Sequence, residues 1–94
     1  MMKYVAWDQE KNERLLATRG IGFEEVINAI FEGKTITVLR HQNVKRYPNQ
    51  CLFVINIDDY AYVVPFVEDK EKVFLKTIYP SRKHTKFYIE KGAL

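Results

Sequence analysis

The segment CLFVINI-DD-YAYVVPFVE, Cys51 to Glu68, decides the fold. Its two apolar halves, Cys51 to Ile57 and Tyr60 to Glu68, are rich in β-branched and aromatic residues and have the length of strands. The Asp58-Asp59 pair between them suits a tight hairpin turn. Pro65 cannot donate to a sheet ladder, so we expect a bulge or an unpaired edge there. The segment therefore predicts an antiparallel hairpin in the middle of the chain.

Further strands flank this hairpin. Thr35 to His41 is rich in β-branched residues, and Val73 to Tyr79 has the same character and stops at Pro80. Tyr4 to Trp7 is a short β-prone stretch at the start of the chain. Consecutive strands favour a meander of antiparallel hairpins.

Helix signals lie at the two ends of the sequence. Asp8 can cap a helix from Gln9 to about Thr18, which Gly20 would end in a left-handed conformation. Ser81 can cap a terminal helix. A second helix is predicted by apolar residues at helical spacing, namely Phe23, Val26, Ile27, Ile30 and Phe31, with Gly33 closing it. We thus predict an α+β domain with two N-terminal helices packed on a four-stranded antiparallel sheet, followed by a C-terminal helix.

Length and composition bound the class of protein. The 94 residues are too few for two domains with cores of their own, so we expect residues 1–94 to form a single domain. No apolar run reaches the roughly 18 residues of a membrane span, and the N-terminus lacks a signal peptide, so we expect a cytoplasmic protein with no membrane partner. Cys51 is the only cysteine, and no phosphate-loop or zinc motif is present. We therefore expect no cofactor and no metal.

The net charge of +3 is mild, but the cations are unevenly placed. The range 34–46 holds four cations and no acid, and the range 76–91 holds five cations against one acid. Arg82 and Lys83 fall in the first turn of the predicted last helix, where the positive end of the helix dipole disfavours each by about 0.3–1 kcal/mol. They are candidates for holding an RNA phosphate; the alternative is a solvated basic helix face.

Candidates for proton transfer are few. His41 and His84 are the only histidines, and either could serve as a general acid or base unless it is an ordinary surface residue. Tyr62 is a further candidate among aromatic residues that could stack on unpaired bases, although core packing explains most of them. Arg19 is a weaker candidate, because a cation beside the Gly20 turn also suits a helix C-terminus.

Three segments in this order resemble the BrnT family of bacterial toxins. The opening Trp7-Asp8 with Lys11 is similar to that family's WD-x-x-K. Thr18 to Glu25, TRGIGFEE, is similar to its K-H-G-[VI]-S-F-E-E turn into the second helix. Pro80 to Thr85, PSRKHT, resembles its S-A-R-K-A-T entry into the last helix. The anchors bracket nearly the whole chain, which departs from the pattern at Arg19, where the family has histidine. The opening from Glu13-Arg14 through Gly20-Ile21 to Gly33 also resembles a group of short bacterial domains of unknown function that are related to such toxins.

The resemblance implies a fold like that of the RelE-type ribonucleases, a metal-free endoribonuclease that blocks translation, and a ribbon-helix-helix antitoxin as partner. We therefore expect an RNA-cleaving toxin of a toxin–antitoxin pair, as a homo-oligomer or a hetero-oligomer with its antitoxin. The alternative is a non-catalytic module that binds a protein or nucleic acid through its basic face. The range Cys51 to Glu68 carries so much apolar and aromatic residue that we expect a partner segment to cover part of it.

Overall fold

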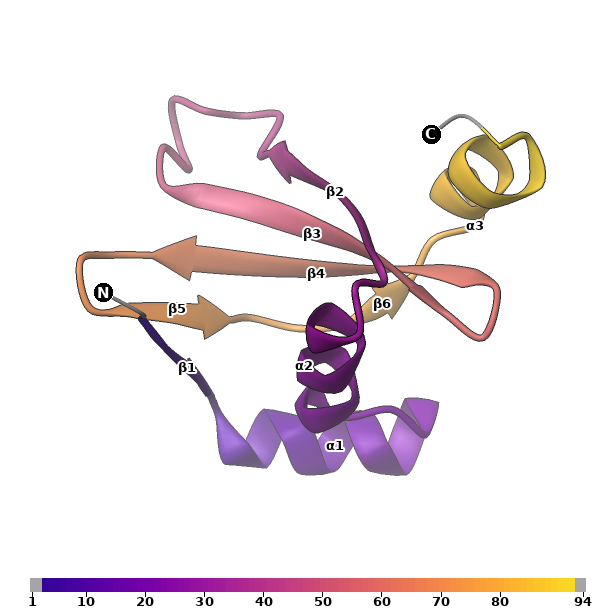
Figure 1. Cartoon of the computed structure of the whole chain (residues 1–94). Coiled ribbons are helices and arrows are strands. Elements are labelled where there is room, and N and C mark those ends of the chain that lie inside the picture. Colours follow the sequence, from indigo (N-terminus) through magenta and orange to yellow (C-terminus); the bar gives the residue numbers. More distant parts are fainter. Residues whose placement is uncertain (1–2, 93–94) are drawn as a thin grey trace.

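A computed structural model describes residues 3–92 of the chain (Figure 1). Strands and helices follow one another in the order β1 (Tyr4–Trp7), α1 (Gln9–Arg19), α2 (Phe23–Phe31), β2 (Thr35–Arg40), β3 (Gln50–Ile57), β4 (Tyr60–Glu68), β5 (Lys72–Leu75), β6 (Tyr79–Pro80), α3 (Arg82–His84) and η1 (Thr85–Glu90). The last of these, η1, is a π-helix that continues α3. The predicted α+β class is confirmed.

The sheet is larger than predicted and is mixed. Its strand order is β1-β5-β4-β3-β2, and the short β6 pairs with β4 beyond the end of β5. The prediction of four antiparallel strands was wrong, because Tyr4–Trp7 joins β5 as a parallel edge strand. The predicted last strand is also divided in two, at Leu75 and Tyr79. The predicted central hairpin is confirmed, since β3 and β4 pair antiparallel over their whole length.

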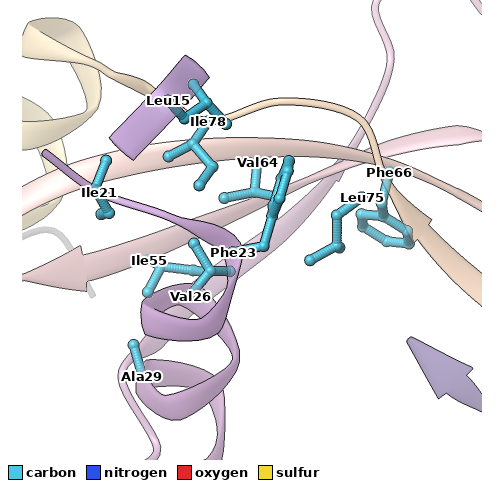
Figure 2. Packing of buried hydrophobic residues seen from close by; sticks show 10 residues of the cluster. All are labelled: Leu15, Ile21, Phe23, Val26, Ala29, Ile55, Val64, Phe66, Leu75 and Ile78. Atoms are coloured by element: carbon cyan, nitrogen blue, oxygen red, sulfur yellow. The ribbon is translucent and has the colours of Figure 1, made fainter. Parts of the chain in front are cut away.

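Helices α1 and α2 cover one face of this sheet and enclose the main core (Figure 1). Phe23 and Val26 of α2 are fully buried against Ile55 of β3 and Val64 of β4. Figure 2 shows these side chains converging from the helix and the sheet, with Leu75 and Phe66 continuing the cluster along the sheet. Phe31 was predicted to join the apolar stripe of α2, but it is 79% exposed at the end of that helix.

The C-terminal helical segment packs on the opposite face. Strand alternation turns Val54 and Val63 away from the α1–α2 core, and both are fully buried. Thr85, at the start of η1, accepts a hydrogen bond from the Ala61 amide at 2.8 Å and donates one to the Ser81 carbonyl at 2.7 Å. This buried hydroxyl anchors α3 and η1 to strand β4.

Most predicted turns and caps are confirmed. Asp8 accepts a hydrogen bond from the Glu10 amide at 3.0 Å, and Gly20 ends α1 with φ of 72°. Asp58 and Asp59 both adopt positive φ, 53° and 63°, which is the geometry of a type I′ hairpin turn. The sequence pattern had therefore located the ends of these elements correctly.

Pro65 sits inside a central strand with no bulge. Its register with β3 is unbroken, and it faces Leu52. The Pro65 carbonyl accepts from the Lys76 amide on the other side, so the proline nitrogen points to the gap between β5 and β6. The missing donor costs nothing there, because no ladder partner faces it.

The expectation that Cys51 to Glu68 exposes a large apolar surface was wrong. Within β3 and β4 the exposed positions lie only at the two ends of β4, at Tyr60 and Glu68. Helices α1 and α2 cover one face of this hairpin, and on the other face α3 and η1 pack on β4 near Ala61 and leave part of the surface open (Figure 1). The hairpin therefore exposes less apolar surface than we expected, and its binding to a partner stays a prediction.

Candidate functional site

A cleft of about 380 Å³ lies where the end of β2 and the start of β3 approach α3 on the face opposite the main core. Its apolar floor comes from the sheet, and its walls come from the end of β2, from the two residues after it, and from β6 and α3. The lining residues are Leu39, Arg40, His41, Gln42, Gln50, Leu52, Pro65, Tyr79, Lys83 and His84. Both histidines of the chain thus line the same cleft, although they are distant in sequence.

The charge of this cleft favours an anion. Arg40 and Lys83 contribute cations, and among the described residues no carboxylate lines it. A cleft of about 440 Å³ beside the β3–β4 turn is larger, but Asp58 and Asp59 face it beside Lys34, so it disfavours a phosphate. The electrostatic character, and not the size, marks the histidine cleft as the candidate site.

His84 is held in place by the residue that caps its helix. Ser81 Oγ accepts from the His84 backbone amide at 3.1 Å and lies 2.6 Å from His84 Nδ1. The imidazole also stacks on the Tyr88 ring, with centroids 6.0 Å apart and planes 8° from parallel. Burial, followed by the charge of Lys83, lowers the pKa of His84 below its usual value of 6.5. His84 is therefore neutral at physiological pH and able to accept a proton.

His41 belongs to an ordered loop. Its Nδ1 accepts a hydrogen bond from the Asn43 amide at 3.0 Å, so the neutral ring carries its hydrogen on Nε2. The ring lies against Tyr47 with centroids 4.4 Å apart, and the Arg46 guanidinium carbon lies 5.5 Å from the Tyr47 centroid. This arrangement fixes the ring and leaves Nε2–H as a hydrogen-bond donor.

The loop itself is organised by Asn43. Its side-chain oxygen accepts from the Arg46 amide at 3.2 Å, and its carbonyl accepts from the Tyr47 amide at 2.9 Å. The segment between β2 and β3 is thus a turn with internal hydrogen bonds. Pairing of β2 with β3 reaches Arg40, opposite Cys51, and the His41 amide donates to the Gln50 carbonyl at 3.0 Å, so the sheet holds the backbone of both cleft residues.

The predicted site residues divide into two groups. Lys83, His84 and His41 line the cleft. Arg82 is exposed at the start of α3 and is not part of the lining, and Arg19 is exposed at the end of α1, which covers the other face. Tyr62 packs against the main core, because alternation turns it away from Pro65 and toward the helices. Catalytic roles for these three residues stay predictions, and none of the three lines the cleft.

Sequence reasoning missed two residues of this cleft. Arg40 was counted in the basic range 34–46 but was not selected, although it immediately precedes His41. Tyr79 was one of several aromatic residues on predicted strands, and nothing distinguished it from Tyr62. One signal for Tyr79 was available in the sequence: it lies just before Pro80 and the helix that Ser81 caps, close to Lys83 and His84 along the chain.

Comparison with protein-family models, curated proteins and solved structures gives no match. Among residues 3–92, no three His, Cys, Asp or Glu side chains are grouped so that they could hold a metal ion. No helix in this part of the chain is long and apolar enough to span a membrane. The chemistry of the cleft must therefore be argued from its own side chains.

Proposed function

We propose that this protein is a metal-independent endoribonuclease and the toxin of a bacterial toxin–antitoxin pair. The observation that carries the proposal is that His41, His84, Arg40 and Lys83 line one cleft, to which no residue among 3–92 contributes a carboxylate. RNA cleavage by its own 2′-hydroxyl needs a base, cations near the phosphorus and a proton for the leaving oxygen. The cleft holds side chains for each of these roles, and the resemblance to BrnT toxins points the same way.

His84 is the base in this proposal. Its lowered pKa keeps it neutral, and donation of Nδ1–H to Ser81 Oγ would leave Nε2 free to take the proton of the 2′-hydroxyl. As that proton leaves, the 2′ oxygen bonds to the adjacent phosphorus and the bond from phosphorus to the 5′ oxygen breaks. The products are a 2′,3′-cyclic phosphate and a free 5′-hydroxyl.

The remaining groups of the cleft act on the phosphate. Arg40 and the His41 Nε2–H stabilise the charge that develops on the non-bridging oxygens. Lys83 adds a cation beside His84. Its ammonium can donate a proton to the leaving 5′ oxygen. One lost charge-stabilising donor of this type costs about 2.7–4 kcal/mol in the transition state.

The partner in this proposal is a ribbon-helix-helix antitoxin. The sheet offers it an edge, because β2 is the terminal strand on its side and its Val38 is 50% exposed. An extended antitoxin segment could add a strand there by main-chain pairing. Co-expression with the product of the neighbouring gene, followed by light scattering, tests this: a stable hetero-oligomer is expected, and a chain that stays monomeric and binds nothing encoded beside it would count against the toxin assignment.

The activity itself is tested in cells and in solution. Induced expression should arrest growth, and the neighbouring gene should rescue it. The purified protein should cleave RNA in the presence of a chelator and leave cyclic phosphate ends. Binding of RNA without cleavage, together with normal growth, would instead support the alternative of a non-catalytic binding module.

A further inference from the structure

Tyr79 is the one large aromatic ring, apart from the two imidazoles, among the residues that line the histidine cleft. It belongs to β6, where it lies opposite Val63 of β4, so its backbone is held by the sheet. Its side chain is 38% exposed. A fixed backbone with a half-exposed ring is the arrangement of a stacking platform.

The surroundings of Tyr79 suit a nucleotide. Leu52 and Pro65 give the cleft an apolar floor, while Arg40 and Lys83 bring two cations to its walls. An apolar surface accepts the face of a base, and the cations accept the phosphate attached to it. The absence of any described carboxylate from this lining removes the main repulsion against an RNA backbone.

We propose that Tyr79 is the base platform of the cleft and that the ligand is an unpaired nucleotide of single-stranded RNA. The proposal deepens the function proposed above, on which its choice of RNA rests. In a duplex both faces of each base are covered by neighbouring base pairs, so a base reaches Tyr79 only when it is unpaired. The cleft therefore selects single strands, loops or ends over a continuous duplex.

Binding can be measured separately from cleavage. A fluorescent oligoribonucleotide with 2′-O-methyl groups has no free 2′-hydroxyl, so it cannot undergo the proposed attack, and its binding is read by anisotropy. Tyr79→Leu should weaken binding of the single strand by about 5- to 150-fold, whereas Tyr79→Phe should stay within about twofold of the unaltered protein. The matched control is Tyr60→Leu, because Tyr60 is similarly exposed at 36% but lies outside the cleft lining.

Two measurements on the unaltered protein guard against a folding defect in Tyr79→Leu. The same strand carrying abasic residues should bind more weakly than the complete strand, and a duplex of the same sequence should also bind more weakly. Equal affinity for the abasic and complete strands, or for duplex and single strand, would overturn the proposal. So would equal losses in Tyr79→Leu and Tyr60→Leu.

The outcomes also separate this proposal from that of the ribonuclease. Tyr79-dependent binding of single strands without any cleavage of unmodified RNA would contradict the ribonuclease and leave the platform standing. If the protein cleaves RNA but Tyr79→Leu changes neither its affinity nor its KM for single-stranded RNA, the base platform alone is contradicted.

Discussion

The hydroxyl of Thr85 should be worth more to this fold than any other single polar atom near the cleft. Thr85 is 3% exposed, and its Oγ1 accepts from the fully buried Ala61 at 2.8 Å while donating to Ser81 at 2.7 Å. Thr85→Val keeps the shape of the side chain and removes both hydrogen bonds. The Ser81 carbonyl keeps a donor, the Thr85 amide at 3.0 Å, whereas the Ala61 amide is left buried without an acceptor.

The cost of that orphaned amide sets the magnitude. An unsatisfied buried donor costs about 1–3 kcal/mol, so we expect the free energy of unfolding to fall by about 2 kcal/mol. For a domain of this size each kcal/mol lowers Tm by about 4–8 °C, which gives a loss of about 8–16 °C. Because Thr85 ties α3 to β4, the loss of its hydroxyl should also loosen His84 and slow cleavage.

Thr85→Ser is the matched control. It keeps the hydroxyl and removes one methyl group, for a cost of about 0.8 kcal/mol. Thermal and urea unfolding of both variants measure the difference directly. If Thr85→Val proves as stable as Thr85→Ser, or more so, the hydroxyl does not hold the C-terminal helix to the sheet as we have argued.

Four further predictions concern the hydrogen bond between Asn12 and the Phe23 amide, the hairpin turn, and the pH dependence of the cleavage rate and of stability. Asn12→Ala should lower the free energy of unfolding by about 1–3 kcal/mol, because the buried Asn12 Oδ1 accepts from the Phe23 amide at 2.7 Å, while Asn12→Asp keeps an acceptor and should lose less in urea unfolding. Asp59→Gly should hold or raise Tm, since Asp59 has φ of 63° and glycine adopts that conformation without strain; a fall of several degrees would show that the Asp59 side chain stabilises the turn. The acidic limb of the cleavage rate should have its midpoint below pH 6.5, because burial and then Lys83 lower the pKa of His84, and Lys83→Gln should move that midpoint upward. The same lowered pKa makes stability depend on pH: the contribution of His84 is complete above about pH 6.5 and is lost as pH falls through the lower pKa of the folded state. In thermal melts across that pH range, His84→Asn should remove this dependence.

Local signals in the sequence predicted local structure well. Asp8, Gly20 and Ser81 mark helix ends because each acts on backbone groups within a few residues. The aspartate pair marked the hairpin for the same reason. Pairing between distant segments was harder: nothing within Tyr4–Trp7 indicates that its partner is β5, or that the pair is parallel.

The candidate site shows the same division. His41, His84 and Lys83 could be selected from their chemistry, but their meeting in one cleft depends on the register of β2 and β3 and on the packing of α3. Tyr62 was selected and Tyr79 was not, although the sequence could not distinguish two tyrosines on predicted strands; only the fold shows that Tyr62 packs against the core and that Tyr79 lines the cleft. Asn12 escaped notice because a buried amide that satisfies a backbone group has no pattern of its own in the sequence.

If the histidine cleft cleaves RNA, the loss of one cation that lines it should slow cleavage far more than the loss of a nearby cation outside it. Initial rates on a labelled single-stranded RNA, with a chelator present, should be measured for the unaltered protein, for Lys83→Gln and for Lys86→Gln. Both changes remove one exposed lysine charge from the C-terminal helical segment, but only Lys83 lines the cleft. We expect Lys83→Gln to lower the rate by a factor of about 10² or more at an unchanged Tm, and Lys86→Gln to stay within a few-fold of the unaltered protein. Equal rates for the two variants, or no cleavage by the unaltered protein, would contradict RNA cleavage by this cleft.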